Sequence, residues 1–427
     1  MFKKLTRLVP VLLTILLLAV SVASAQDATT LRIWHYEAAD SAMGIAWDAA
    51  MVKFQEMHPE VTIEFELKTF EQIQQTGQMV LNSAEAPDVM EINKGNATAG
   101  LYASQGLLTD LTEVAAERGW DEILSPSVLT TSRYDANGIM GSGPLYGVTN
   151  YGEFVMVYYN KTMFEERGMA VPTSYEELTA IADQFVAEGI VPFALGDLDK
   201  WPLTHNYYEL VLYGADRDFV NAYELYQGDI DFQNSPLASG AQLLVEQVEK
   251  GYLSPEALGM TYDDANAGFV QGTYPMDLTG SWAFGGFSTS ITDFEWGIFL
   301  MPGKTLNTGS GGNLWVVPTG AVNKDLAYEF IDLTLSPEIQ SILANAGGIP
   351  VNADLSQIAD PKTLELNTAF STLVANDGLA FYPDWPAPGY MDVLGAGLQD
   401  LFTGAVDVPT FIDAIAAPWL DYKSFLG

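Results

Sequence analysis

Three features of the sequence predict an α/β fold. First, residues 31–92 alternate between hydrophobic patterns typical of strands and of helices, in the order strand, helix, strand, helix, strand. Second, each pair of strands is separated by enough chain for a crossover helix, which favours a parallel sheet with helices on its faces. Third, 427 residues of which 48% are hydrophobic and 12% aromatic can form two or three domains with their own cores.

The first half of this unit is expected to be a strand over 31–34 and a helix that begins after Asp40 or Ser41. Either side chain can cap a helix, and the pair His58-Pro59 ends it. Four apolar residues recur at helical spacing in between, and they are Trp47, Met51, Phe54 and Met57. We therefore expect Trp47 to belong to the core.

The second half begins with residues 61–67, where apolar and polar side chains alternate as in a half-buried strand. A helix is expected over 70–82 and a third strand over 88–92. Ligands of parallel sheets bind beyond the carboxyl ends of the strands. The loops at 35–39 and 93–96 therefore become the first candidates for a binding site.

Later elements are predicted in the same way. Residues 196–218 are polar and aromatic, and Trp201 and Trp385 are assigned to loops that contain proline, whereas Trp296 is assigned to the core. The other expected elements are a strand over 153–160, a helix over 175–188, a strand ending in a tight turn over 274–282, a strand over 314–317 and a helix over 324–334.

The N-terminal 25 residues predict export. A basic stretch is followed by an apolar run from Leu8 to Val20 and by Ala23-Ser24-Ala25, the three parts of a secretory signal. The apolar run is short for a membrane-spanning helix, so we expect cleavage before Gln26 and a periplasmic or extracellular protein. The chain has no cysteine, which excludes disulfides and an anchor attached through a lipidated cysteine.

Charge and motifs exclude several function classes. The chain has 18 basic and 55 acidic residues, a net charge of −37, which argues against nucleic acid and anionic membranes as partners. Its three histidines form no zinc motif, and the nucleophile-elbow motif is absent. The sequence Gly303-Lys304-Thr305 lacks the first glycine of a phosphate loop. We therefore expect no catalytic residues, no metal and no cofactor.

Several segments, in this order along the chain, resemble the bacterial extracellular solute-binding proteins of family 1. These are the substrate-binding proteins of carbohydrate ABC transporters, similar to maltose-binding protein. The segments that carry the resemblance are 31–35, Ala86-Pro87-Asp88-Val89, 145–148 with 157–161, 172–178, Met276 to Trp282, Gly311-Gly312 with the strand after it, 324–331 and 347–351. Each is weak alone, but together they span most of the chain after the signal.

The resemblance implies a two-lobed fold of the type II periplasmic-binding-protein class, with a hinge and a ligand cleft between the lobes. The first lobe would hold residues 27–148 and 314–357, and the second 149–313 and 358–427. The protein would be a monomer without enzymatic activity that captures a carbohydrate and delivers it to an ABC transporter permease in the membrane.

Sugar sites combine aromatic rings, which stack on the apolar faces of pyranoses, with planar polar groups that bind hydroxyls. Trp282 is the strongest candidate, because glycines flank it in a turn and it matches the stacking tryptophan of the family. The other aromatic and histidine candidates are Trp34, His35, Tyr36, Trp201 and Trp385. The remaining candidates are Glu37, Asn93, Asn96, Asn150, Glu153, Asn206, Gly312 and Asn313.

Two other functions remain open from the sequence. A receptor of the same fold for a polyamine or another cationic solute would suit the acidic charge and the aromatic loops. A secreted carbohydrate-degrading enzyme would need two converging carboxylates, which 55 acidic residues neither identify nor exclude.

Overall fold

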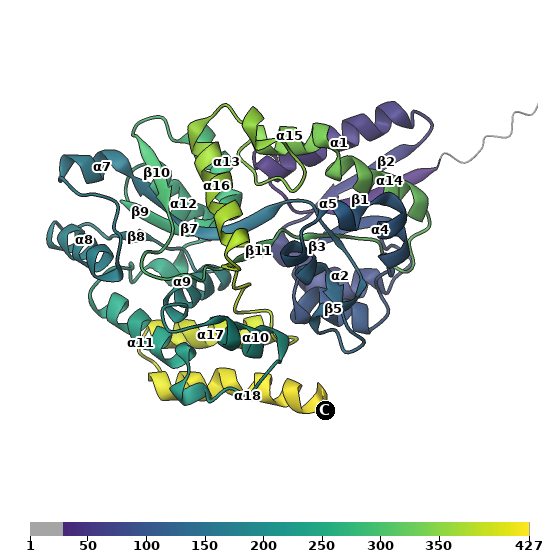
Figure 1. Ribbon diagram of the computed structural model, residues 1–427. Coiled ribbons are helices and arrows are strands. Elements are labelled where there is room, and N and C mark those ends of the chain that lie inside the picture. The colour runs from purple at the N-terminus through teal and green to yellow at the C-terminus, as the bar shows by residue number, and fades with distance from the viewer. Residues whose placement is uncertain (1–28, 427) are drawn as a thin grey trace, which may run out of the picture.

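The predicted strand–helix unit is confirmed at the start of the described chain, which is residues 29–426 of a computed structural model. The predicted signal over 1–25 lies outside these residues. The described chain forms two lobes, each built around its own β-sheet (Figure 1). Among these residues no helix is long and apolar enough to cross a membrane.

The first sheet combines the N-terminal strands with strands from far along the chain. The neighbouring pairs among the first three strands of the chain are parallel, as predicted, whereas the two remaining strands are antiparallel to their neighbours. In spatial order the strands are β2 (Thr62–Leu67), β1 (Thr30–His35), β3 (Val89–Ile92), β12 (Leu314–Val316) and β6 (Val148–Thr149).

Alternation along the strands sends side chains to both faces of this sheet. Leu31, Ile33 and Val89 pack with one group of helices, and Met90 and Ile92 pack on the opposite face. The helices of this lobe are α1 (Ala42–Met57), α2 (Phe70–Leu81), α3 (Leu101–Ser104), α4 (Thr112–Arg118), α5 (Trp120–Ile123), α6 (Pro126–Leu129), α14 (Lys324–Leu335) and α15 (Pro337–Asn345). A small hairpin-like sheet of β4 (Arg133–Tyr134) and β5 (Met140–Leu145) lies beside them.

The predicted start of α1 is confirmed, because the Ser41 hydroxyl accepts a hydrogen bond from the N–H of Gly44 at 2.9 Å. Trp47 is fully buried, as expected. The half-buried pattern of 61–67 holds only in part. Ile63 and Phe65 are half-buried, but Leu67, the last residue of this edge strand, is 53% exposed.

The second sheet is centred on β7 (Gly152–Asn160), a strand whose residues are all buried. The strand expected over 153–160 is thereby confirmed. Strand β7 is paired with other strands along both of its edges. The strands are, in order, β10 (Trp296–Phe299), β7, β9 (Met276–Gly280) and β8 (Phe193–Ala194), with β11 (Gly309–Gly311) also paired to β7.

One part of the second lobe differs from the prediction. The sequence predicts a loop at Trp201, but this residue begins a helix, α9, since proline at the next position is tolerated in the first turn of a helix. The helices of this lobe are α7 (Lys161–Glu166), α8 (Tyr175–Ala187), α9 (Trp201–Val211), α10 (Arg217–Leu225), α11 (Pro236–Glu249), α12 (Tyr262–Val270), α13 (Phe284–Ser290), α16 (Pro361–Ala375), α17 (Tyr390–Phe402) and α18 (Val408–Leu426).

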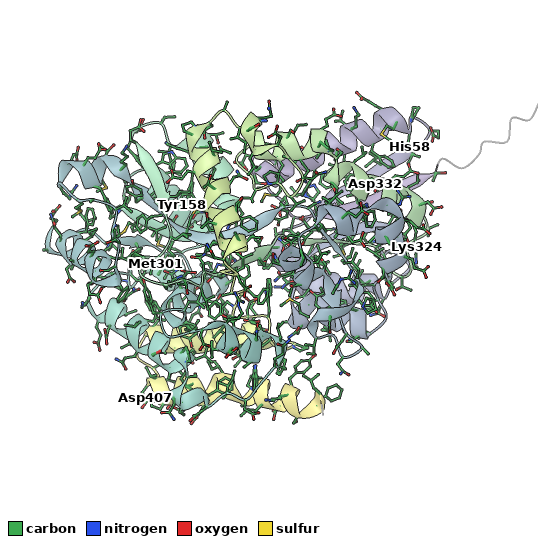
Figure 2. All side chains as sticks on the ribbon, in the orientation of Figure 1. His58, Tyr158, Met301, Lys324, Asp332 and Asp407 are labelled. Atoms are coloured by element: carbon green, nitrogen blue, oxygen red, sulfur yellow. The ribbon has the colours of Figure 1, made fainter. Side chains whose placement is uncertain are left out.

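The chain passes repeatedly between the two sheets. Strand β6 of the first sheet leads directly into β7 of the second, and β11 leads back into β12. After α15 the chain passes Pro350, which bridges to Tyr151, and continues into α16 beside β7. Segments far apart in sequence therefore share a lobe: His58, Lys324 and Asp332 lie on one side of Figure 2, and Tyr158, Met301 and Asp407 on the other.

Candidate functional site

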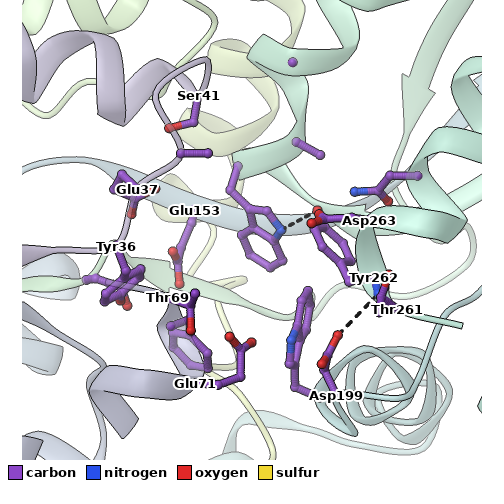
Figure 3. A pocket seen from close by; sticks show the side chains of 18 of the residues that line it. Tyr36, Glu37, Ser41, Thr69, Glu71, Glu153, Asp199, Thr261, Tyr262 and Asp263 are labelled. Atoms are coloured by element: carbon purple, nitrogen blue, oxygen red, sulfur yellow. Dashed lines mark hydrogen bonds between the residues drawn. The ribbon is translucent and has the colours of Figure 1, made fainter. Parts of the chain in front are cut away.

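A cleft of about 950 Å³ lies between the two lobes. On the first lobe it is lined by residues that follow β1, β2 and β3, which is where a parallel sheet presents its ligand site. On the second lobe it is lined by α9, α12, α13 and the residues that precede α17. In Figure 3, Tyr36, Glu37 and Thr69 lie across the cleft from Tyr262 and Asp263.

The second lobe contributes a continuous group of rings, which we call the aromatic cluster. The ring of Trp201 lies 4.6 Å from that of Tyr262, and His205 lies 5.7 Å from Trp282, measured between ring centroids. The cluster consists of Trp201, His205, Tyr262, Trp282, Tyr382 and Trp385, each with its nearest ring neighbour within about 6 Å. All six rings line the cleft.

Local structure explains why these rings converge. Trp201 and His205 are four residues apart on α9, so they share one face of that helix. Trp282 stands in the turn directly after β9, and its Nε1–H donates a hydrogen bond to the Tyr262 hydroxyl at 2.9 Å. Gly280 makes room for the indole, because a Cβ at this position would lie 2.1 Å from the Trp282 ring.

A chain of hydrogen bonds forms the polar floor of the cleft. The ammonium of Lys94 donates to Glu153 Oε1 at 2.6 Å and to Asn313 Oδ1 at 2.8 Å. The amide of Asn313 donates to the Tyr151 hydroxyl at 2.9 Å, and this hydroxyl donates to Glu37 Oε1 at 3.2 Å. All of these side chains are at least nine-tenths buried, so the floor is fixed before any ligand arrives.

Burial changes the protonation of several groups in the cleft. It raises the pKa of Glu37 to about 7, with the nearby charge of Glu153 acting in the same direction. It raises the pKa of Asp384 to about 6 and lowers that of His205 to about 3. His205 is therefore a neutral ring at pH 7, suited to packing beside an uncharged ligand rather than to carrying charge.

The mouth of the cleft is acidic on both lobes. Asp40 and Glu71 come from the first lobe, and Asp199 and Asp263 from the second. Burial and the charges of these neighbours raise the pKa of Asp263. In Figure 3 the Asp199 carboxylate points toward the start of α12, where it accepts a hydrogen bond from the N–H of Tyr262 at 3.4 Å. A negatively charged ligand would be repelled here.

The structure brings eight of the predicted site residues into the cleft: Tyr36, Glu37, Asn93, Glu153, Trp201, Trp282, Asn313 and Trp385. The other six predicted residues, Trp34, His35, Asn96, Asn150, Asn206 and Gly312, do not line it.

Three of these six pack against other parts of the protein: His35 and Gly312 are buried, and Trp34 is half-buried. His35 is 1% exposed, stacks on Phe65 and accepts the Glu37 N–H at Nδ1. Trp34 points to the other face of β1, where Lys68 lies 4.3 Å from its ring. Gly312 packs against Tyr151, whose ring a Cβ would approach to 2.4 Å.

The three asparagines are buried away from the cleft. Asn96 donates to the carbonyls of Glu224 and Pro386 and accepts the N–H of Met140. Asn206 donates to a carbonyl of its own helix, that of Pro202. Asn150 is fully buried at the crossing into β7, so no ligand reaches it in this conformation.

The sequence analysis missed several residues that line the cleft. Lys94 stands between the candidates Asn93 and Asn96, and Asp384 directly precedes the candidate Trp385. His205 could have been found, because it lies one helical turn beyond Trp201 once the stretch is read as a helix. No local pattern identifies Tyr262 or Tyr382, since both reach the cleft only through tertiary structure.

The arrangement is suited to binding. The aromatic cluster shares the cleft with carboxylate and amide side chains, a combination of apolar and polar groups that is typical of small-molecule sites. The described residues contain no group of three or more His, Cys, Asp or Glu side chains that could hold a metal ion. The Glu153 carboxylate is paired with the Lys94 ammonium at 2.6 Å.

Known proteins share both sequence and fold with this chain. It is 25% identical over 354 residues to an ABC transporter extracellular-binding protein of Pyrococcus horikoshii, covering 80% of this chain and 75% of that protein. It is 26% identical over 377 residues to the diacetylchitobiose binding protein of Streptomyces coelicolor, covering 84% and 81%.

Solved structures give the same fold at lower sequence identity. A chitin oligosaccharide binding protein superposes with a TM-score of 0.80 at 20% identity, covering 93% of this chain and all of that one. The maltose-bound MalE3 of T. maritima superposes with a TM-score of 0.75 at 17% identity, covering 94% and 100%. The expected two-lobed solute-binding fold is thereby confirmed. The family model for bacterial extracellular solute-binding proteins matches residues 38–341, so this chain belongs to that family.

Proposed function

We propose that this protein binds an uncharged oligosaccharide in the cleft and delivers it to the permease of an ABC importer. The observation that carries the proposal is the pairing of the aromatic cluster with a fixed polar floor in one cleft. Its volume of about 950 Å³ lies at the upper end of the usual range for small-molecule sites, which favours more than one sugar ring. The names of the sequence relatives, which include a diacetylchitobiose binding protein, agree with this substrate class.

We further propose the division into lobes and the export of the chain. The proposed first lobe is 27–148 with 314–357, and the second 149–313 with 358–427; the packing of α17 and α18 on α9 and α11 supports the assignment of the C-terminus. The N-terminal signal pattern and the extracellular relatives support export. The Ala23-Ser24-Ala25 pattern supports release before Gln26. We propose that the protein acts as a monomer and turns over no substrate.

A panel of ligands tests the proposal. Melting temperature is measured with gluco-, chito- and xylo-oligosaccharides and with spermidine, and each hit is quantified by titration calorimetry. A bound sugar at 100 times its Kd stabilises the folded state by about 2.7 kcal/mol, an easily measured shift. Stabilisation by spermidine without any by sugars would contradict the proposal. Sustained release of shorter sugars by the pure protein would show an enzyme instead.

The position of the Trp282 ring can be tested without altering the ring. Gly280→Ala places a methyl where the indole lies, and the backbone at Gly280 (φ −90°, ψ 170°) suits alanine, so displacement of the ring is the main effect. We expect sugar affinity to fall about tenfold, which corresponds to about 1.4 kcal/mol. Gly259→Ala, where a Cβ meets no atom within 4 Å, is the matched control and should bind as the parent does. Equal affinities of the two variants would show that the indole position is unimportant.

A further inference from the structure

Lys94 occupies an unusual place, since its side chain meets segments from widely separated parts of the chain. It follows β3 of the first lobe, and its ammonium is bonded to Glu153 near the start of β7 and to Asn313 between β11 and β12. These partners stand at two of the places where the chain passes between the sheets. Lys94 is 1% exposed.

The same ammonium also contacts the aromatic cluster. It lies 5.7 Å from the ring centre of Tyr382 and 5.3 Å from that of Trp385, both in the segment between α16 and α17. A cation over the face of an aromatic ring attracts it and restrains its orientation. Gly95 adds to this junction, because the Trp385 ring fills the space that a Cβ would occupy.

The backbone of the first lobe is joined to the same segment beside Lys94. The N–H of Ala97 donates to the carbonyl of Trp385 at 3.0 Å, and Asn96 donates to that of Pro386. Lys94 is thus the charged centre of a buried junction that connects the first lobe to both crossings and to the segment between α16 and α17.

We propose that Lys94 is a positioning residue that sets the angle between the lobes and the orientation of the Tyr382 and Trp385 rings, and thereby sets affinity for the ligand. This inference rests on the proposed function for its effect on affinity. Its effect on the lobe angle is a property of the ligand-free protein. With the ammonium removed, Glu153 and Asn313 lose their shared partner. The start of β7 then has no side-chain bond to Lys94, and the crossing at Asn313 is held to β3 only by the backbone pairing of β12.

The test measures the distance between the lobes in the absence of ligand. Because the chain has no cysteine, spin labels can be attached specifically to Met79→Cys on α2 and Leu198→Cys before α9, both more than half exposed. In Lys94→Met the distance distribution should shift or broaden by more than about 2 Å, the scale of a domain rearrangement. Sugar affinity should fall at least about tenfold, and Lys94→Arg should restore part of both properties.

A second buried ion pair provides the control. Lys304 and Glu209 also meet at 2.6 Å and are almost fully buried, but both belong to the second lobe. Lys304→Met should lower stability as any broken buried pair does, yet leave the distance between the labels unchanged. A merely structural role for Lys94 predicts that the two lysine variants behave alike.

The double variant Lys94→Met/Glu153→Gln covers the case in which Lys94→Met fails to fold, because it leaves no unpaired buried charge. A parental distance distribution in the folded Lys94 variants would overturn the inference. If instead the parent protein binds no sugar while the distances shift, the proposed function fails and the positioning role of Lys94 stands.

Discussion

Replacing Trp282 with alanine is expected to weaken sugar binding by roughly 30-fold or more, since truncating an aromatic anchor at the centre of a site commonly costs about 2 kcal/mol. The indole is half-buried, lines the cleft and is fixed by its hydrogen bond to Tyr262. A sugar ring stacked on it would lose water from one face. Titration calorimetry with the best sugar of the panel measures the effect.

Trp282 also contributes to folding, because it packs against the cores of both lobes. The alanine variant should therefore melt at a lower temperature as well, and binding is measured where it is still folded. Trp282→Phe keeps a ring and should recover part of the affinity.

Trp296 is the matched control, as it is 4% exposed and does not line the cleft. Trp296→Phe should lower the melting temperature and leave the Kd unchanged. An unchanged Kd in Trp282→Ala would refute stacking on this residue.

The elements of the fold were predictable where their pattern is local. The strand at 31–34 and the helix after Ser41 follow from periodicity and capping, and the structure has both. The composition of each sheet does not follow from local patterns. Strand β12 joins β3 across more than 200 residues of chain, and only the family resemblance indicated that the lobes are discontinuous.

The site was predictable to the level of loops, and less so to the level of side chains. Loops after β1 and β3 do line the cleft, yet within them Glu37 faces it and His35 does not. That choice depends on the direction of each strand end and on packing against Phe65, which no single sequence reveals. Asparagines are plausible sugar ligands by their chemistry, but the amide of Asn96 donates instead to two backbone carbonyls of the other lobe, those of Glu224 and Pro386.

The stability of the protein should also depend on pH through a buried carboxyl group. Asp277 lies on β9, is 3% exposed, and its Oδ2 has no hydrogen-bond partner among the described residues. Burial raises its pKa to about 8 from an ordinary value of 3.8. Between these two pH values the folded protein keeps a proton that the unfolded chain has released. Stability is therefore lost as the pH rises through this window, and the loss is complete above pH 8.

Asp277→Asn removes this dependence, because the amide has nearly the same shape and never ionises. Each unit of pKa difference is worth about 1.4 kcal/mol, so at pH 9 the variant should be more stable than the parent by at least about 2 kcal/mol, after allowing for the buried amide N–H groups. At pH 4 both side chains are neutral in the folded state and the difference should vanish or reverse. Urea unfolding at a series of pH values measures this difference in stability, provided that the slope with urea is the same for both proteins.

Other buried carboxyls, such as Glu37, act in the same direction in both proteins and cancel in the comparison. A difference that is the same at pH 4 and pH 9 would show that Asp277 does not hold its proton in the folded protein.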